Sequence, residues 1–487
     1  MYLNIFIFSC LFSWVTLRYL QFRYVNTLSG DNITHLLFHN LVKNNMAYNP
    51  AGIVGSGRLN LPLALYRISA FILPKYFVGK SILLPSMNVF ILIIIEVILF
   101  GALYLQTNDI AFAFTATLAF SFFPAFGLIT TIEAGSYLKF SERMPALFAN
   151  SLLAVLLNGV IELSLLVNYA LILVTLCFSC VLGKFSRQVV VMVFTSFVVI
   201  NFRLDYMLVV CGGILFLLLQ KHFRSEVIAH LKYLQTYKNF QSQNFEVSEE
   251  RLLNLGIPGV FRRNRLFRIY LRLLLHSGLN IILCFPTVIY VFYYGTPDVQ
   301  ALVVIVIIYS IATTTHFLYF VGPGFRYLYN VLPLLLITQL NYDANTQLLL
   351  LVNLLITIIS IFKNHKKIRS KIDDTNNKIL AFTKIKERVV DHKTIFFDHY
   401  KDAEIFQLIC GTNVEIKLST SRDYSWTAEC KKIFSKYPWV DFSESTLKTF
   451  TVAYVISIKS DLKIDGARNI YQSDGYNLYE ITSNAET

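Results

Sequence analysis

Long apolar runs, separated by short polar connections, fill the chain up to residue 362. A helix needs roughly 20 apolar residues to cross the hydrocarbon core of a bilayer. About eleven segments approach this length: 2–22, 83–105, 109–130, 145–166, 167–183, 188–202, 204–220, 269–294, 299–320, 328–341 and 346–362. The pattern predicts an α-helical polytopic membrane protein. The count can change by one or two, because two short segments can form one bent span.

The first apolar segment has no basic residue before it and no small-residue cleavage site, so we interpret it as a retained anchor. The loop that follows, 23–82, opens with an amphipathic helix over Ser29–Lys43. Its apolar stripe is formed by Ile33, Leu36, Leu37 and Leu41. Asp31, His35 and His39 recur at i, i+4 and i+8 and line one edge of the same helix. We expect this helix to lie at the membrane surface, with a carboxylate at its leading end suited to chemistry on a lipid head group.

The rest of this loop contains a glycine-spaced turn and basic side chains. A glycine-spaced turn, Asn49–Arg58, allows a close approach of the backbone and ends on a basic side chain. The segment Leu59–Lys75 is predicted to form a second helix, broken at Pro74, with Arg67 available to phosphates. The alternative is an amphipathic hairpin that only packs on the bilayer.

Acidic residues elsewhere in the membrane part are further candidates. The connection 130–145 carries Glu133, Glu142 and Arg143, which are either interfacial anchors or the source of a second carboxylate. Glu96 lies in the middle of an apolar run, where a charge is costly and therefore indicates a function.

Two remaining features of the membrane part differ in specificity. A rigid Gly-Pro-Gly turn at 322–324 sets Arg326 and Tyr327 at the mouth of the next apolar segment. An arginine in that place suits bidentate phosphate binding. The basic stretch 221–268 is interpreted as a solvated charge run along the membrane.

The composition changes after residue 362. Residues 363–400 are predicted to be a basic, partly helical linker, and 401–487 a small α/β accessory domain. The strand-like runs are 404–410, 414–420, 450–459 and 476–481, and the helical run is 427–437. The domain has no phosphate-binding glycine loop and no nucleophile elbow, which favours an accessory role. Cys410 and Cys430 are a candidate disulfide if the domain is exported.

Composition supports the assignment as a membrane protein and limits the classes of binding partner. The mean hydropathy is +0.54, well above the range of a soluble enzyme, and the formal net charge is +13. The basic residues flank apolar segments and do not gather in one patch, which excludes nucleic acid and points to anionic lipids or phosphate-bearing substrates.

The order of these parts resembles the GT-C superfamily. These membrane glycosyltransferases use polyprenyl-phosphate sugars and include protein O-mannosyltransferases and the lipid A aminoarabinose transferase. The resemblance covers residues 1–345 in architecture and rests on three short stretches: Gly30-Asp31 with His35, Arg58 before Leu59-Asn60-Leu61-Pro62, and Arg326-Tyr327. It implies transfer of a sugar from a polyprenyl-phosphate donor to a hydroxyl of a glycan, lipid or protein acceptor.

The resemblance also implies roles for single residues. Asp31 matches the acidic residue that acts as base or assists a metal, and Arg58 and Arg326 match basic residues that contact the donor phosphate. Many members have two adjacent acids, whereas Asn32 follows Asp31 here, so a second carboxylate has to come from Glu133 or Glu142. Metal dependence is left open, and no other cofactor is assigned.

Two other classes remain as alternatives. A lipid-linked oligosaccharide flippase should show two corresponding halves with broken helices, and no such repeat is visible. A polysaccharide or O-antigen polymerase or ligase usually has its long loop late in the chain. The loops 23–82, 131–144, 184–187, 221–268 and 321–327 and the C-terminal tail are predicted to share one face, which carries nearly every loop Lys and Arg. The positive-inside rule would make this basic face cytoplasmic. The resemblance implies a bacterial inner or plasma membrane with the active face extracytoplasmic, and we follow it because long loops cross largely regardless of charge.

Overall fold

The structure is a computed structural model of the 487-residue chain. The residues that it describes are 2–25, 31–44, 64–78, 81–121, 140–228, 230–231, 295–312, 330, 332–334, 336–337, 369–370, 372–389, 395–397, 400–410, 434–436, 439–440, 452–458, 466–473 and 475–481. The chain divides into two compact units, the first formed by 1–23 and 87–365 and the second by 24–86 and 366–487. Each unit is described by itself.

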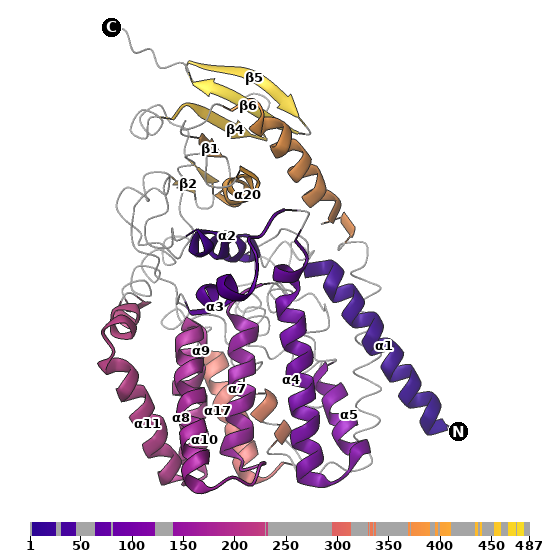
Figure 1. The fold of residues 1–487 in the computed structure, drawn as a ribbon, viewed down its shortest axis with the longest axis vertical. Coiled ribbons are helices and arrows are strands. Elements are labelled where there is room, and N and C mark those ends of the chain that lie inside the picture. The colour runs from indigo at the N-terminus through magenta and orange to yellow at the C-terminus, as the bar shows by residue number, and fades with distance from the viewer. Residues whose placement is uncertain are drawn as a thin grey trace, which may run out of the picture. The chain divides into compact units, whose positions relative to one another are not determined.

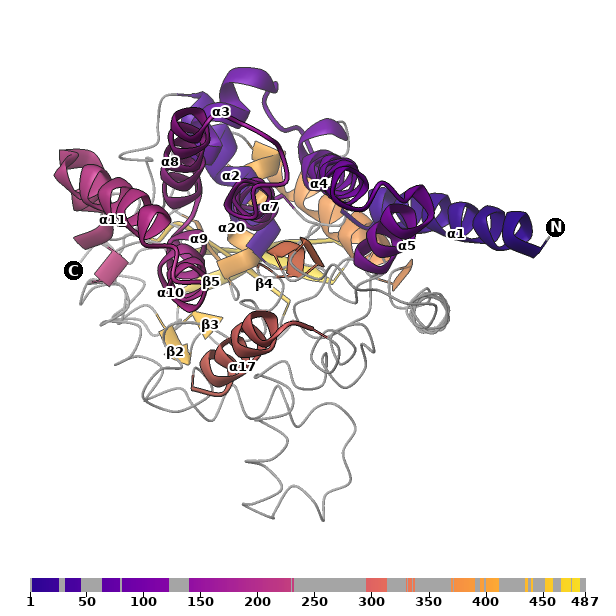
Figure 2. The ribbon, with the colours of Figure 1, turned by 90° about the horizontal axis from the view of Figure 1, so that it is seen from below.

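The elements of the first unit are α1 (Tyr2–Val25), α4 (Leu83–Thr107), α5 (Ile110–Ser121), α7 (Arg143–Leu157), α8 (Leu165–Leu182), α9 (Lys184–Val189), the π-helical η1 (Val190–Phe194), α10 (Thr195–Ile200), α11 (Leu204–Leu219) and α17 (Pro297–Ala312). In this unit, α4, α7 and α8 run in nearly the same direction (Figure 1) and are seen nearly end-on in Figure 2, whereas α1 is seen along its length. The helices of the unit lie where the hydrophobic pattern predicts apolar segments, which confirms a mainly helical membrane protein.

Two helices of the described residues, α4 and α8, are long and apolar enough to cross a membrane. A third candidate in the same part of the chain is α11 together with 221–228, a pair bent by 91°. Other apolar helices, among them α7, are shorter than a span. The predicted segments 269–294 and 346–362 lie outside the described residues, so the number of about eleven spans stays a prediction.

The boundary predicted at residues 166 and 167 is wrong. The connection between α7 and α8 lies at 158–164, and Leu165 and Leu166 belong to α8. Asn158 caps α7, and Gly159 follows with a φ of 60°, the left-handed conformation in which helices commonly end. The Asn-Gly pair was the signal for this turn, although it stands inside a continuous apolar run. Glu162 is exposed in the connection.

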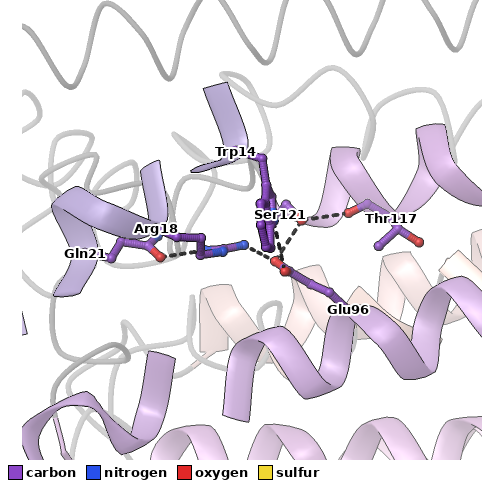
Figure 3. Close-up of polar contacts among 6 residues, drawn as sticks. All are labelled: Trp14, Arg18, Gln21, Glu96, Thr117 and Ser121. Carbon is purple, nitrogen blue, oxygen red and sulfur yellow. Dashed lines mark hydrogen bonds and ion pairs between the residues drawn. The ribbon is translucent and has the colours of Figure 1, made fainter. Parts of the chain in front are cut away.

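Glu96 lies in the interior of the first unit, where it joins three helices (Figure 3). Arg18 of α1 donates to Glu96 Oε1 and also, at 2.6 Å, to Gln21 Oε1. Trp14 Nε1 donates to Glu96 Oε2 at 3.1 Å, and the Ser121 hydroxyl of α5 donates to Oε1 at 2.7 Å. Arg18 and Glu96 are only 3% and 5% exposed. Both carboxylate oxygens of Glu96 are hydrogen-bonded, although Arg18 Nε has no partner among the described residues. Removing one member of a buried pair is costly, so the functional hint taken from the position of Glu96 has a structural explanation.

Glu96→Ala should destabilise the folded protein by about 3–5 kcal/mol, because it leaves a buried guanidinium without its carboxylate. Replacing both partners, Arg18→Met with Glu96→Leu, should recover most of that loss. Unfolding of the purified protein in detergent measures both. Equal losses in the single and double variants would show that the ion pair is not the source of the cost.

The second unit joins the first loop to the C-terminal part of the chain. Its elements are α2 (Asp31–Lys43), α3 (Ala64–Ile72), β1 (Ile395–Phe397), α20 (Tyr400–Cys410), β2 (Phe434–Lys436), β3 (Trp439–Val440), β4 (Tyr454–Ser457), β5 (Ala467–Ser473) and β6 (Tyr476–Ile481). Four strands form a sheet in the order β1-β4-β6-β5, in which β1 and β4 are parallel and the other neighbours antiparallel. β2 and β3 pair separately.

Aromatic rings form the core between this sheet and its helices. Phe382, from the helical residues 372–386, contacts Phe397 of β1, Phe406 of α20 and Tyr476 of β6, with centroids 5.9, 5.7 and 4.8 Å away. β1 and β4 are buried along their whole length, whereas β5 is mostly exposed. The small α/β character predicted for this part of the chain is therefore present.

Two local predictions in this part are wrong. The run 404–410, expected as a strand, belongs to α20, and Phe434–Lys436, expected inside a helix, forms β2. In the first case Ile405, Phe406 and Leu408 fit a helix whose faces are buried on two sides. The domain boundaries at 362 and 400 stay predictions. In the structure, α2 of the first loop packs on α20.

Candidate functional site

The helix that begins at Asp31 is buried from two sides. Its apolar stripe is inaccessible, since Ile33, Leu36, Leu37 and Leu41 are at most 4% exposed. On the side of α20, the Thr34 hydroxyl donates to Glu404 Oε2 at 2.7 Å, and both side chains are 3% exposed. On the side of α3, histidines of the polar edge make hydrogen bonds. The expectation of a one-sided surface helix is corrected: α2 is an internal helix of the second unit.

His35 contacts the next helix of the loop. Its Nδ1 lies 2.5 Å from the Tyr66 hydroxyl, and the two rings stack with centroids 6.0 Å apart. Tyr66 is fully buried, whereas His35 is partly accessible. The hydroxyl of Tyr66 can therefore fix the orientation and the tautomer of His35, one turn after Asp31.

His39 is a packed histidine. Its Nε2 lies 3.0 Å from the Pro74 carbonyl, which can only accept, so Nε2 carries the proton. Nδ1 lies 2.9 Å from the Ser69 hydroxyl. Burial lowers the pKa of His39 below its usual 6.5; the Pro74 carbonyl opposes this shift and the Lys43 charge adds to it. Lys43 in turn donates to the Ala70 carbonyl, so the end of α2 is fixed to α3.

The lowered pKa of His39 predicts a pH dependence of stability. A buried neutral imidazole contributes stability that is complete above the unfolded-state pKa of 6.5 and decreases as the pH falls below it, because the unfolded chain then binds the proton more readily. Thermal unfolding of the wild type should therefore shift downwards in this range, and His39→Gln should reduce the shift. The exposed His222 gives the control, His222→Gln, which should keep the wild-type slope. An unchanged slope in His39→Gln would contradict this role.

Asn32 at the start of α2 is a residue whose importance the sequence did not show. It is 3% exposed, and among the described residues neither its Nδ2 nor its Oδ1 has a hydrogen-bond partner. An unsatisfied buried amide costs about 1–3 kcal/mol, so native proteins rarely keep one without a function. It directly follows Asp31, the first residue of the helix. The adjacent acid of the GT-C pattern would have stood in its place.

Glu142 and Arg143 belong to the first unit. Glu142 precedes α7, and its carboxyl lies against Gly183 at the end of α8, so close that a Cβ on Gly183 would be 3.1 Å from Glu142 Cδ. Arg143 is the first residue of α7. The start of α7 and the end of α8 therefore lie at the same end of the bundle. This agrees with the prediction that the loops 131–144 and 184–187 share one face.

The other predicted site residues, Arg58, Glu133, Arg326 and Tyr327, lie outside the described residues, as do Cys430 and the glycine-rich turn before Arg58. Cys410 is buried in α20. In the part of the chain that the structure describes, no three His, Cys, Asp or Glu side chains are grouped as metal ligands would be. Metal dependence remains open.

Comparisons with known proteins show the fold. No protein-family model matches the sequence, and no curated protein matches it. Among solved structures, the crystal structure of ArnT from Cupriavidus metallidurans bound to undecaprenyl phosphate is similar, with a TM-score of 0.54. The match covers 99% of this chain and 98% of that chain at 8% sequence identity. The chain has the GT-C fold.

The match extends over both units of the chain, since it leaves out about 1% of the residues. The membrane bundle, the first loop and the C-terminal part thus all belong to the shared architecture. The resemblance found on three short stretches is confirmed at the level of the fold, and the roles of single residues stay predictions.

Proposed function

We propose that the chain is a membrane glycosyltransferase that transfers a sugar from a polyprenyl-phosphate donor to an acceptor hydroxyl. The observation that carries this proposal is the ArnT-like fold over nearly the whole chain, together with the undecaprenyl phosphate that is bound in the ArnT crystal structure. The proposal is also supported by Asn32, the residue after Asp31 in α2, which is buried and whose amide has no hydrogen-bond partner among the described residues.

The proposed chemistry requires few groups. The phosphate of the donor is already a good leaving group, so the protein has to bind it and to deprotonate the acceptor. Asp31 acts as the general base, a role worth about 10²–10⁴ in rate. Direct attack by the acceptor oxygen on the anomeric carbon breaks the bond to phosphate and inverts that centre. The proton passes to the Asp31 carboxylate, and the lipid phosphate leaves.

Other residues bind and orient in this proposal. Arg58, Arg326 and Tyr327 hold the donor phosphate, with Arg143 as a further cation. His35, oriented by Tyr66, contacts the acceptor or Asp31. A second carboxylate, if the reaction uses one, comes from Glu133 or Glu142. The active face is extracytoplasmic in this proposal, and the sugar and the acceptor are left unassigned.

Asp31→Asn should reduce transfer from a polyprenyl-phosphate sugar by about 10²–10⁴ while leaving the protein inserted and folded, because the change removes basicity and keeps the shape. Transfer by purified protein, with unfolding temperature as the second readout, measures this. The matched control is Asp374→Asn, whose carboxylate is 67% exposed on the helical residues 372–386 and should be dispensable. Near-normal turnover of Asp31→Asn would remove Asp31 from the reaction.

The variant Asn32→Leu tests whether the Asn32 amide binds a ligand or has only a structural role. Leucine is similar in size and removes the unsatisfied amide, so the free energy of unfolding should stay the same or increase by about 1–3 kcal/mol. If the amide binds donor or acceptor, transfer should fall nonetheless. Activity and stability measured on the same preparation decide this, and a stable Asn32→Leu with full activity would exclude Asn32 from the site.

A further inference from the structure

A cavity of about 280 Å³ lies in the first unit. Its walls come from the end of α8, from α9 and η1, from the second half of α11 and from the residues that follow α11. Among the described residues that line it, most are apolar, and the polar side chains are Arg187, Gln188 and His230. Its size is slightly below that of ordinary small-molecule sites, which suits part of a long ligand better than a whole one.

Arg187 is the charged group of this cavity. It is 8% exposed, its Nε donates to the Cys180 carbonyl at 2.6 Å, and its Nη2 pairs with Glu226 Oε2 at 2.7 Å. The guanidinium carbon lies 4.6 Å from the centre of the Phe223 ring. Nη1 is buried and has no hydrogen-bond partner among the described residues. A guanidinium that lines a cavity and whose Nη1 has no acceptor is suited to bind an anion, because its unpaired N–H groups are costly until a ligand accepts from them.

The position of the cavity selects the kind of anion. The helical residues 221–228 turn by 91° from α11, as expected of a segment that leaves a span and runs along the membrane surface. Lys221 and Arg224 are exposed on this segment and add positive charge beside Glu226. An anionic head group of the membrane surface therefore meets several cations here.

The cavity is also accessible from the lipid-facing side of the bundle. Val191 and Leu218 line it and are 51% and 37% exposed, next to exposed apolar residues of α11 such as Phe216 and Leu219. A hydrocarbon chain can thus enter from the surrounding bilayer. Val191 and Met192 belong to the π-helical turn η1, and such turns are frequent at functional sites because they displace side chains from regular helical positions.

We propose that this cavity binds an anionic phospholipid of the surrounding membrane, with one acyl chain between η1 and α11 and the phosphate at Nη1 of Arg187. The proposal does not depend on the glycosyltransferase function. It assigns Arg187 a ligand and gives the bent segment 221–228 the role of a cover over the lipid head group.

The test uses the full chain in nanodiscs that contain phosphatidylglycerol with a photoreactive acyl chain. After illumination, mass spectrometry measures labelling of the peptides that contain 187–192 and 223–231. Arg187→Gln should lower labelling about tenfold, the effect of one hydrogen bond to a charged group. Val191→Trp, at a half-exposed position, should block the chain to a similar extent without removing a buried charge.

Each variant has a matched control. Arg203→Gln removes an exposed arginine of the first unit that does not line the cavity, and Val199→Trp adds the same ring at a residue that is 48% exposed on α10. Both should label like the wild type, and diacylglycerol with the same photoreactive chain should label weakly. Undiminished labelling in Arg187→Gln and Val191→Trp, or equal labelling by diacylglycerol, would overturn the proposal. Displacement by undecaprenyl phosphate, where the same fraction of unlabelled phosphatidylglycerol does not compete, would overturn the assignment to a membrane phospholipid.

Discussion

The arrangement of the second unit depends on the hydrogen bonds that the polar side chains of α2 make. Burial of a helix that carries Thr34, His35 and His39 is favourable only if most of its polar groups find partners, because each unpaired one costs free energy. The partners come from two distant parts of the sequence. Tyr66 and Ser69 of α3 bind the histidines, and Glu404 of α20 accepts from Thr34. The C-terminal part therefore acts as one wall of the first loop, which is a physical reason for this loop and the accessory domain to occur in one chain.

The same rule governs the first unit, where buried charges lie among apolar helices. Glu96 is placed in the middle of α4 and is satisfied by Arg18, Trp14 and Ser121. This network ties α1 and α5 to α4 and uses both oxygens of the carboxylate. Arg18 Nε and Arg187 Nη1 are both buried without a hydrogen-bond partner among the described residues. Arg187 differs in that it lines a cavity, so a ligand can reach its unpaired nitrogen.

The hydrophobic pattern predicted the helices of the membrane part well, because a span is a long local signal. The pattern failed where a short turn lies inside an apolar run, as at Asn158-Gly159. It also failed where tertiary packing decides between helix and strand, as in 404–410. The helix that begins at Asp31 and its polar edge were predicted, but the elements that this edge contacts were not. An amphipathic pattern shows which residues share a face and does not show that α20, nearly 370 residues further on, covers another face. The unsatisfied amide of Asn32 has no sequence signal at all, since only the fold determines what surrounds it.

The central claim is that the start of α2 is where the chain meets a lipid-phosphate donor. The most direct measurement is the mapping of a photoreactive undecaprenyl phosphate, with the photoreactive group next to the phosphate, on the full chain in nanodiscs. The account predicts that mass spectrometry finds the label in peptides of the first loop, including the first turn of α2, and that unlabelled undecaprenyl phosphate removes it. A label confined to helices of the first unit, with none in the first loop, would contradict the account.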